Sequence, residues 1–274
     1  MIRNYFKIAW RTLHRNKTFS LINISGLALG MACSLIIYLW IDDERSIDAF
    51  HAHNDQLYVI YETQHHDGVI DAGHYTPGLL WEELKTLYPE VKYASPMAWN
   101  EDNTFEANDK IMKKSGDYGS PDFFSMFSYP LIAGQPETAL SSPVDIAISR
   151  KMAEDFFGSP EAAYGQQIRF QNKKDLKITA VFENVPHQSS IKFDYILNWE
   201  TFLEDNGWAR EWGNNGPSTY LVLQPGTDVK AFGDKILNFL AEKHEADQNK
   251  NFVIKLHLQK FSERYLHSNF RNGE

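Results

Sequence analysis

The chain has 274 residues, of which 43% are hydrophobic and 14% aromatic, enough for one large or two modest hydrophobic cores, which excludes global disorder. The net charge of −9 is unevenly spread, because residues 1–41 hold five basic and no acidic side chains, which leaves −14 for the remainder. The negative charge of residues 42–274 repels phosphate backbones and argues against nucleic-acid binding. The positive charge of residues 1–41 favours binding to an anionic membrane surface.

Residues 1–17 have the periodicity of an amphipathic helix. Apolar side chains share one helical face and basic side chains share another. The apolar set is Tyr5, Phe6, Ala9, Trp10 and Leu13, and the basic set is Arg3, Lys7, Arg11, His14 and Arg15. Helices of this kind lie in the interface plane of a lipid bilayer. We therefore expect an interfacial helix here, with an unstructured basic flank as the alternative.

Residues 18–41 form an uncharged, largely apolar segment of 24 residues. As a helix the segment would extend roughly 36 Å, enough to cross a hydrocarbon core of about 30 Å. Basic residues precede it and Asp42, Asp43 and Glu44 follow it, so the positive-inside rule places residues 1–17 in the cytoplasm and residues 42–274 outside. A cleaved signal peptide is the alternative, but its apolar region would be shorter and would end at a small-residue cleavage site.

Small residues recur every four positions within this predicted transmembrane helix. Gly26, Gly30 and Ser34 therefore share one face, on which another helix could approach closely. We predict that these three residues form a helix-packing site in the membrane. The alternative is that glycine is simply frequent in membrane helices. Cys33 lies in the same segment and is the only cysteine, so an intramolecular disulfide is excluded.

The residues after the span contain two strand–helix–strand patterns. Runs rich in β-branched and aromatic residues predict strands, and apolar residues three or four positions apart predict helices. In chain order the first pattern is Leu57–Gln64, Pro77–Leu87 and Val91–Ala98, and the second is Ser218–Leu223, Asp228–Lys243 and Asn251–Gln259. Two such patterns at the ends of one domain favour a split, ferredoxin-like α+β unit built from residues 55–119 and 212–274.

An insertion with short elements of its own, residues 120–211, separates the two patterns. A helix is expected at Ser149–Phe157, and strands are expected at Gln167–Phe170 and Leu176–Phe182. The predicted fold class is therefore α+β. One N-terminal transmembrane helix precedes a two-subdomain outer domain, residues 42–274, in which the ferredoxin-like unit carries an inserted mixed α/β subdomain.

Distinctive segments are spread along the whole chain. They are Asn4–Arg11, Leu21–Gly30, Phe123–Phe127 with Leu131–Gly134, Ala147–Ser149 with Ala153–Gly158, and Thr179–Pro186 followed by His187–Ser190. Singly, each has a structural explanation, since phenylalanine, glycine and proline in such places usually serve packing and turns. In this order and spacing they resemble the MacB-like periplasmic core domain of FtsX-type ABC-transporter permeases.

The resemblance implies an architecture and a set of partners. Such permeases have an inner-face helix, one span, a periplasmic domain with a porter-like and an inserted subdomain, and three further spans, so this chain is expected to be the N-terminal part of a longer permease. They function in the bacterial inner membrane as dimers, either homodimers or pairs with a paralogous permease. Their other partners are a cytoplasmic ATP-binding subunit and a periplasmic adaptor or lipoprotein. The implied function is export or mechanical transmission through the periplasmic domain.

The sequence carries no common catalytic motif. No Gly-Lys pair is present, so the phosphate-binding P-loop is absent and ATP hydrolysis is expected in a separate subunit. The GxSxG, HExxH and CxxC motifs are also absent. We therefore expect a non-enzymatic chain without a cofactor. His65, His66, Asp67, Asp71 and His74 could offer metal ligands, but a solvated polar turn is the preferred interpretation.

A function from another class stays open. One span followed by about 230 outer residues also describes the extracytoplasmic sensory domain of a membrane receptor. Three further spans after this chain would indicate a permease, whereas a second span leading to a kinase would indicate a receptor.

Overall fold

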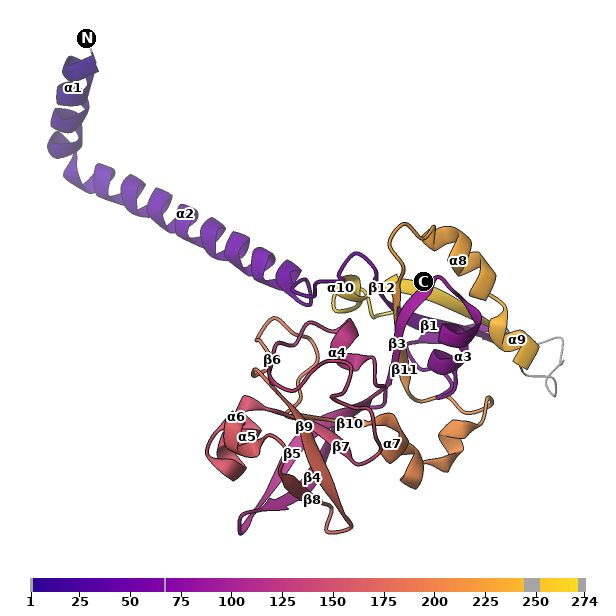
Figure 1. Ribbon diagram of the computed structural model, residues 1–274. Helices are drawn as coiled ribbons and strands as arrows, with labels where there is room; N and C mark the ends of the chain where they lie inside the picture. Colours follow the sequence, from indigo (N-terminus) through magenta and orange to yellow (C-terminus); the bar gives the residue numbers. More distant parts are fainter. Residues whose placement is uncertain (1, 67, 244–251, 271–274) are drawn as a thin grey trace. The chain divides into compact units, whose positions relative to one another are not determined.

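The computed structural model describes residues 2–66, 68–243 and 252–270, and its chain divides into two compact units, Met1–Ser46 and Ile47–Glu274. The first unit consists of the helices α1 (Ile2–Arg15) and α2 (Lys17–Ser46) (Figure 1). α2 has 30 residues and no buried side chain, and by length and composition it could cross a membrane. The aromatic side chains of α1 are likewise exposed, as expected for a helix that binds a surface outside the protein.

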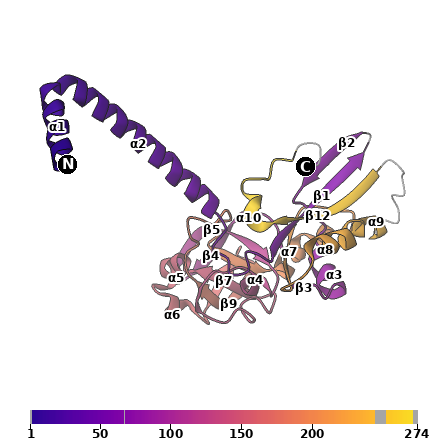
Figure 2. The same cartoon turned by 90° about the horizontal axis from the view of Figure 1, so that it is seen from above.

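The second unit begins with an antiparallel sheet of five strands. The strands are β1 (Leu57–His66), β2 (Val69–Gly73), β3 (Val91–Met97), β11 (Ser218–Leu223) and β12 (Phe252–Lys260). Their order is β12-β1-β11-β3. β2 pairs with the end of β1 (Figure 2). Each strand–helix–strand unit is thus split by a strand of the other unit, which is the ferredoxin-like arrangement that the sequence predicted. We call this sheet the split sheet.

Three helices pack on one face of the split sheet. They are α3 (Leu80–Leu87), α8 (Val229–Ile236) and α9 (Phe239–Lys243). Their apolar side chains share a core with Ile60, Leu221 and Leu256. The single helix expected at Asp228–Lys243 is therefore interrupted. The carbonyl of Leu237, at the interruption, accepts a hydrogen bond from the amide of Leu256 on β12, so pairing with the sheet replaces helical pairing there.

The remaining strands form a second sheet that closes on itself. They are β4 (Glu101–Ala107), β5 (Lys110–Gly119), β6 (Leu131–Ala133), β7 (Asp145–Ser149), β8 (Gln167–Phe170), β9 (Lys174–Phe182) and β10 (Tyr195–Asn198). The order β6-β9-β7-β10-β5-β4-β8 is completed by pairing of β8 with β9, which makes a closed ring of six strands with β6 outside it. We call this ring the barrel, and closure protects its strand edges.

Short helices accompany the barrel and the domain's end. They are α4 (Phe123–Met126), α5 (Arg150–Phe157), α6 (Pro160–Ala163), α7 (Trp199–Asp205), the 3₁₀ helix η1 (Gly207–Arg210) and α10 (Phe261–Arg264). α5 begins where expected, because the Ser149 hydroxyl accepts a hydrogen bond from the amide of Met152 and caps the helix. α5 and α7 share a core with the barrel strands.

The boundary expected at residue 120 differs from the division between the two sheets. Strands β4 and β5, residues 101–119, belong to the barrel, although they were assigned to the ferredoxin-like unit. The reason is the pairing of β5 with β10 and of β4 with β8, which lie far along the chain. The chain therefore crosses from the split sheet to the barrel at residues 98–100 and returns at residues 211–217.

A phenylalanine-rich core joins the split sheet to the barrel. α4 and the residues after it supply Phe123, Phe124 and Phe127, all buried. They pack with side chains from the free face of the split sheet and from the barrel. These are Leu57, Val59, Tyr220 and Val222 on the first side, and Ala147, Ala180, Phe182 and Ile196 on the second. Phe261 of α10 belongs to the same cluster. We call this cluster the joining core.

Candidate functional site

The predicted packing site on α2 is fully accessible in the first unit. A side chain built at Gly26 or Gly30 would meet no atom within 4 Å. The Ser34 hydroxyl donates a hydrogen bond of 2.9 Å to the carbonyl of Gly30, which satisfies it within the helix. The three residues thus leave a shallow face on which a second helix could pack closely. Packing there stays a prediction.

The domain begins with a tightly bonded entry segment, residues 47–54. The Asp48 side chain is fully buried, and its carboxylate accepts hydrogen bonds from the amide and the hydroxyl of Ser190, the former at 2.8 Å. The Asp48 amide donates to the carbonyl of Gln188 at 2.8 Å. Burial raises the pKa of Asp48 above its usual value, although the Ser190 bonds favour the charged form. The entry segment is therefore fixed to the loop before β10.

His51 fixes the same segment to a second loop. Its Nδ1 accepts a hydrogen bond of 3.0 Å from the Ser128 amide, and the Ala52 amide donates to the Ser128 hydroxyl at 2.7 Å. The ring of His51 lies against Phe127 and Phe261, with centroid distances of 5.4 and 5.5 Å. Burial lowers the pKa of His51 to about 4, so the imidazole is neutral at ordinary pH.

The sequence did not single out the entry segment as an anchor. The structure uses His51 as a buried neutral acceptor of a hydrogen bond, a role that its neighbours in the sequence do not indicate. A detectable signal was the motif Phe123–Phe127, which supplies the aromatic surroundings of His51. The partner that pairs with Asp48 lies 142 residues away, so no local pattern reveals it.

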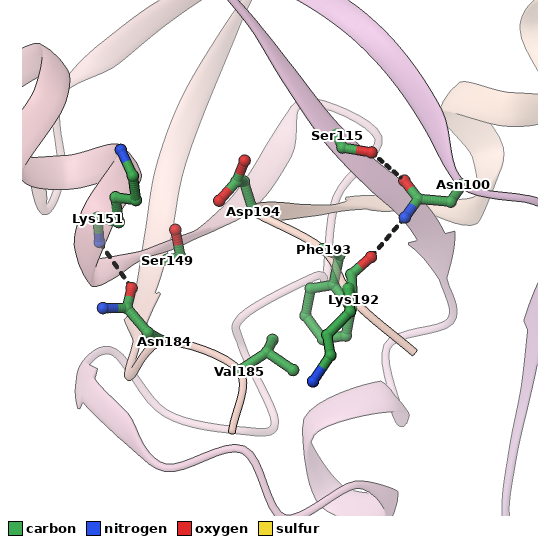
Figure 3. Close-up of a pocket in the computed structure, with 9 residues that line it drawn as sticks. All are labelled: Asn100, Ser115, Ser149, Lys151, Asn184, Val185, Lys192, Phe193 and Asp194. Carbon is green, nitrogen blue, oxygen red and sulfur yellow. Dashed lines mark hydrogen bonds between the residues drawn. The ribbon is translucent and has the colours of Figure 1, made fainter. Parts of the chain in front are cut away.

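A hollow of about 390 Å³ lies beside the start of α5 (Figure 3). Its lining residues are Asn100, Ser115, Ser149, Lys151, Asn184, Val185, Lys192, Phe193 and Asp194. The Asn100 side chain accepts from the Ser115 hydroxyl at 2.6 Å and donates to the Lys192 carbonyl. The Asn184 side chain accepts from the Lys151 amide at 2.9 Å.

Several polar side chains of this hollow are bonded to groups outside its lining. Ser149 caps α5, so its hydroxyl is held by a backbone amide rather than by a general base. The Lys151 ammonium pairs with Asp155 at 2.8 Å. A nucleophile activated by an adjacent base, the arrangement that covalent catalysis needs, is not formed by the lining side chains among the described residues.

The polar cluster near the β1–β2 turn is committed to other bonds where it is described. His74 Nε2 pairs with the side chain of Gln259 at 2.6 Å, and the Tyr75 hydroxyl donates to Asp71 at 3.0 Å. Asp67 lies outside the described residues. Within residues 2–66, 68–243 and 252–270, no three His, Cys, Asp or Glu side chains are placed to hold a metal ion.

Comparison with known proteins gives one family match and several similar folds. The model of the MacB-like periplasmic core domain matches residues 20–239. A domain of a putative permease protein from Porphyromonas gingivalis is 21% identical, with a TM-score of 0.65 over 77% of this chain and 92% of that one. No curated protein matches the chain.

Two further solved structures are more distant. The periplasmic region of MacB from Actinobacillus actinomycetemcomitans is 13% identical, with a TM-score of 0.47 over 71% of this chain and 87% of that one. The extracellular domain of the noncanonic ABC-type transporter YknZ from Gram-positive bacteria is 14% identical, with a TM-score of 0.47 over 71% and 98%.

Proposed function

This chain belongs to the family of MacB-like periplasmic core domains, and from that membership we propose that its outer domain serves an ABC-transporter permease in export or mechanical transmission. The observation that carries the proposal is the extent of the family match, residues 20–239, which starts inside α2 and covers the barrel and every strand of the split sheet except β12. A transmembrane anchor and the two-part outer domain therefore recur together, as a transmission device requires.

The entry segment supports a mechanical role. Five hydrogen bonds tie Asp48, His51 and Ala52 to two separate loops of the domain. These residues directly follow α2 in the chain, which favours a role for the entry segment in mechanical transmission. The work itself would come from ATP hydrolysis in a separate cytoplasmic subunit, since this chain has no P-loop.

The proposal includes a location and partners. Residues 1–17 lie on the cytoplasmic side of the inner membrane, residues 18–41 cross the bilayer, and residues 42–274 lie in the periplasm. The span pairs with a second permease subunit, identical or paralogous, through Gly26, Gly30 and Ser34. The outer domain contacts a periplasmic adaptor or a lipoprotein.

Cysteine labelling tests the orientation. In a Cys33→Ser background, a Ser46→Cys variant should react with a membrane-impermeant thiol reagent in cells whose outer membrane has been permeabilised. A Thr18→Cys variant, at the opposite end of the uncharged segment, should react only after the inner membrane is opened. Reaction of Thr18→Cys but not Ser46→Cys in intact inner membranes would overturn the proposed orientation.

The sensory alternative shares this topology, so it needs a separate measurement. Reconstitution in nanodiscs with an ABC-type ATP-binding subunit should give a complex whose ATP hydrolysis depends on the permease chain. A receptor domain would form no such complex. Linkage of this domain to a kinase in the coding sequence would contradict the permease proposal.

A further inference from the structure

Two short segments carry the chain between the split sheet and the barrel, and each is held by a buried carboxylate. Residues 98–100 lead from β3 to β4, and residues 211–217 lead from η1 to β11. The carboxylates are Asp117 on β5 and Glu62 on β1, which are 4% and 0% exposed. Neither takes part in an ion pair found among the described residues, so burial is not offset by a cation in direct contact.

Asp117 holds the first crossing from the barrel side. Its Oδ1 accepts hydrogen bonds from the amide of Ala98 at 2.9 Å and from the amide of Tyr118 at 2.7 Å. Ala98 is the first residue after β3, so one bond fastens the point at which the chain leaves the split sheet. The bond to Tyr118 lies within β5, whereas the bond to Ala98, 19 residues away, connects β5 to the end of β3.

Glu62 holds the second crossing from the sheet side. Its Oε1 accepts hydrogen bonds from the side-chain amides of Gln64 and Asn215, the latter at 2.8 Å. Asn215 also pairs with Pro77 in an isolated bridge. Glu62 Oε2 and Asn215 Oδ1 are both buried without a hydrogen-bond partner among the residues that the structure describes. Two acceptors left unpaired at one place indicate a missing donor, and a proton on the carboxyl group supplies one.

We propose that Asp117 and Glu62 form a pH-sensitive latch, which holds residues 98–100 and 211–217 when the carboxyl groups are protonated and loosens them when the groups ionise. The joining core remains intact in both states and acts as the fixed support between sheet and barrel. The inference concerns this chain's own conformations and does not depend on the proposed transport function.

The electrostatic surroundings agree with the geometry. Burial raises the pKa of Asp117 to about 7, and the charge of Glu101 adds to that rise, while the amides of Tyr118 and Ala98 oppose it. Lys192, Arg264 and Tyr220 line the same hollow of about 310 Å³ as Asp117. These three side chains are the other titratable groups that line this hollow.

Glu62 titrates in the same range for the same reason. Burial raises the pKa of Glu62 to about 7, against the opposing effect of its bonds with Gln64 and Asn215. Tyr75 is the titratable group that responds to Glu62, and its hydroxyl is bonded to Asp71. Both carboxyl groups are thus protonated below neutral pH, where the latch is closed, and ionised above it.

The sign of the effect follows from linkage. Each carboxyl group has a higher pKa in the closed form than it would have in water, so the closed form binds the proton more tightly. Closure is therefore favoured fully at pH below about 4 and weakens as the pH rises through about 7. A carboxyl group with a pKa of about 7 in the closed form has an ordinary pKa of about 4 in the open form. The equilibrium constant for opening the latch then rises about tenfold between pH 6 and pH 8.

Hydrogen exchange of the chain in nanodiscs tests the latch. Protection factors, corrected for the intrinsic pH dependence of amide exchange, are measured at pH 6 and pH 8 for peptides that cover residues 96–101 and 212–217. We expect protection in both peptides to fall about tenfold from pH 6 to pH 8. Equal protection at the two pH values in the wild-type chain would overturn the proposal, and this comparison requires no variant to fold.

Two neutral variants assign the response to each carboxyl group. Asp117→Asn should remove the pH response near Ala98 and leave the response near Asn215, and Glu62→Gln should do the reverse. Asp145→Asn is the matched control, because Asp145 is a buried barrel carboxylate that accepts the Ser142 amide within its own turn. Loss of both responses in the control, or retention of a segment's response in its own variant, would contradict the assignment.

Discussion

Truncation of Phe127 should break the joining core. The side chain is 1% exposed and lies between the entry segment, the split sheet and α10, with ring centroids 5.4 Å from His51, 5.6 Å from Tyr220 and 5.5 Å from Phe261. A buried phenylalanine removes roughly 150–200 Å² of apolar surface from water, worth about 4 kcal/mol. Phe127→Ala also leaves a cavity between rings that belong to different elements and cannot close it together, so we expect the free energy of unfolding to fall by about 3–5 kcal/mol.

The measurement is urea unfolding of the outer domain in detergent, followed by near-ultraviolet circular dichroism. Ile111→Ala is the control, because Ile111 is 67% exposed on β5 and its truncation should change the free energy by less than about 0.5 kcal/mol. A loss below about 1 kcal/mol for Phe127→Ala, with an unchanged denaturant slope, would show that sheet and barrel do not depend on this core.

Three further results are expected. Gly134→Ala should cost about 2 kcal/mol or more in thermal unfolding, because φ is 92° and a Cβ would lie 2.4 Å from the Thr179 carbonyl, whereas Gly165→Ala, at φ 80° with no atom within 4 Å, should cost about half as much. Gly30→Leu should weaken subunit crosslinking in the membrane by about 1–2 kcal/mol, and equal assembly would reduce α2 to an anchor. Nuclear magnetic resonance should show that His51 stays neutral down to about pH 5, because burial lowers its pKa to about 4. The contribution of the neutral ring to the free energy of unfolding is therefore present above about pH 6.5 and is lost as the pH falls toward 4.

Local patterns predicted individual strands of both sheets well. The bounds of β11 and β8 agree with the expected Ser218–Leu223 and Gln167–Phe170, because apolar and β-branched runs between turn residues indicate strands directly. The order of the sheet also followed, since two strand–helix–strand units of this length have few ways to pair. The apolar helix was evident from length and charge alone, although the structure extends it to Ser46.

The barrel was less accessible to this reasoning. Its closure depends on the pairing of β8 with β9 and of β4 with β8, and register between distant strands leaves no local trace. The hairpin of β4 and β5 did carry a signal, because Asn and Asp are residue types that tolerate the positive φ of a tight hairpin turn. In the structure, Asn108 and Asp109 have φ values of 49° and 59°. That turn shows the two strands to be neighbours, but only the pairing of β5 with β10 assigns them to the barrel.

The buried carboxylates were the hardest to find, because each depends on burial that only the fold creates. Asp48, Glu62 and Asp117 look like ordinary surface acids in the sequence, yet all three are at most 4% exposed and hold segments that are distant or belong to another sheet. A domain that only anchored a binding surface could dispense with buried carboxylates, since apolar side chains would fasten the same crossings at lower desolvation cost. Their presence in the entry segment and at both crossings places titratable groups at the segments that connect separate parts of the outer domain.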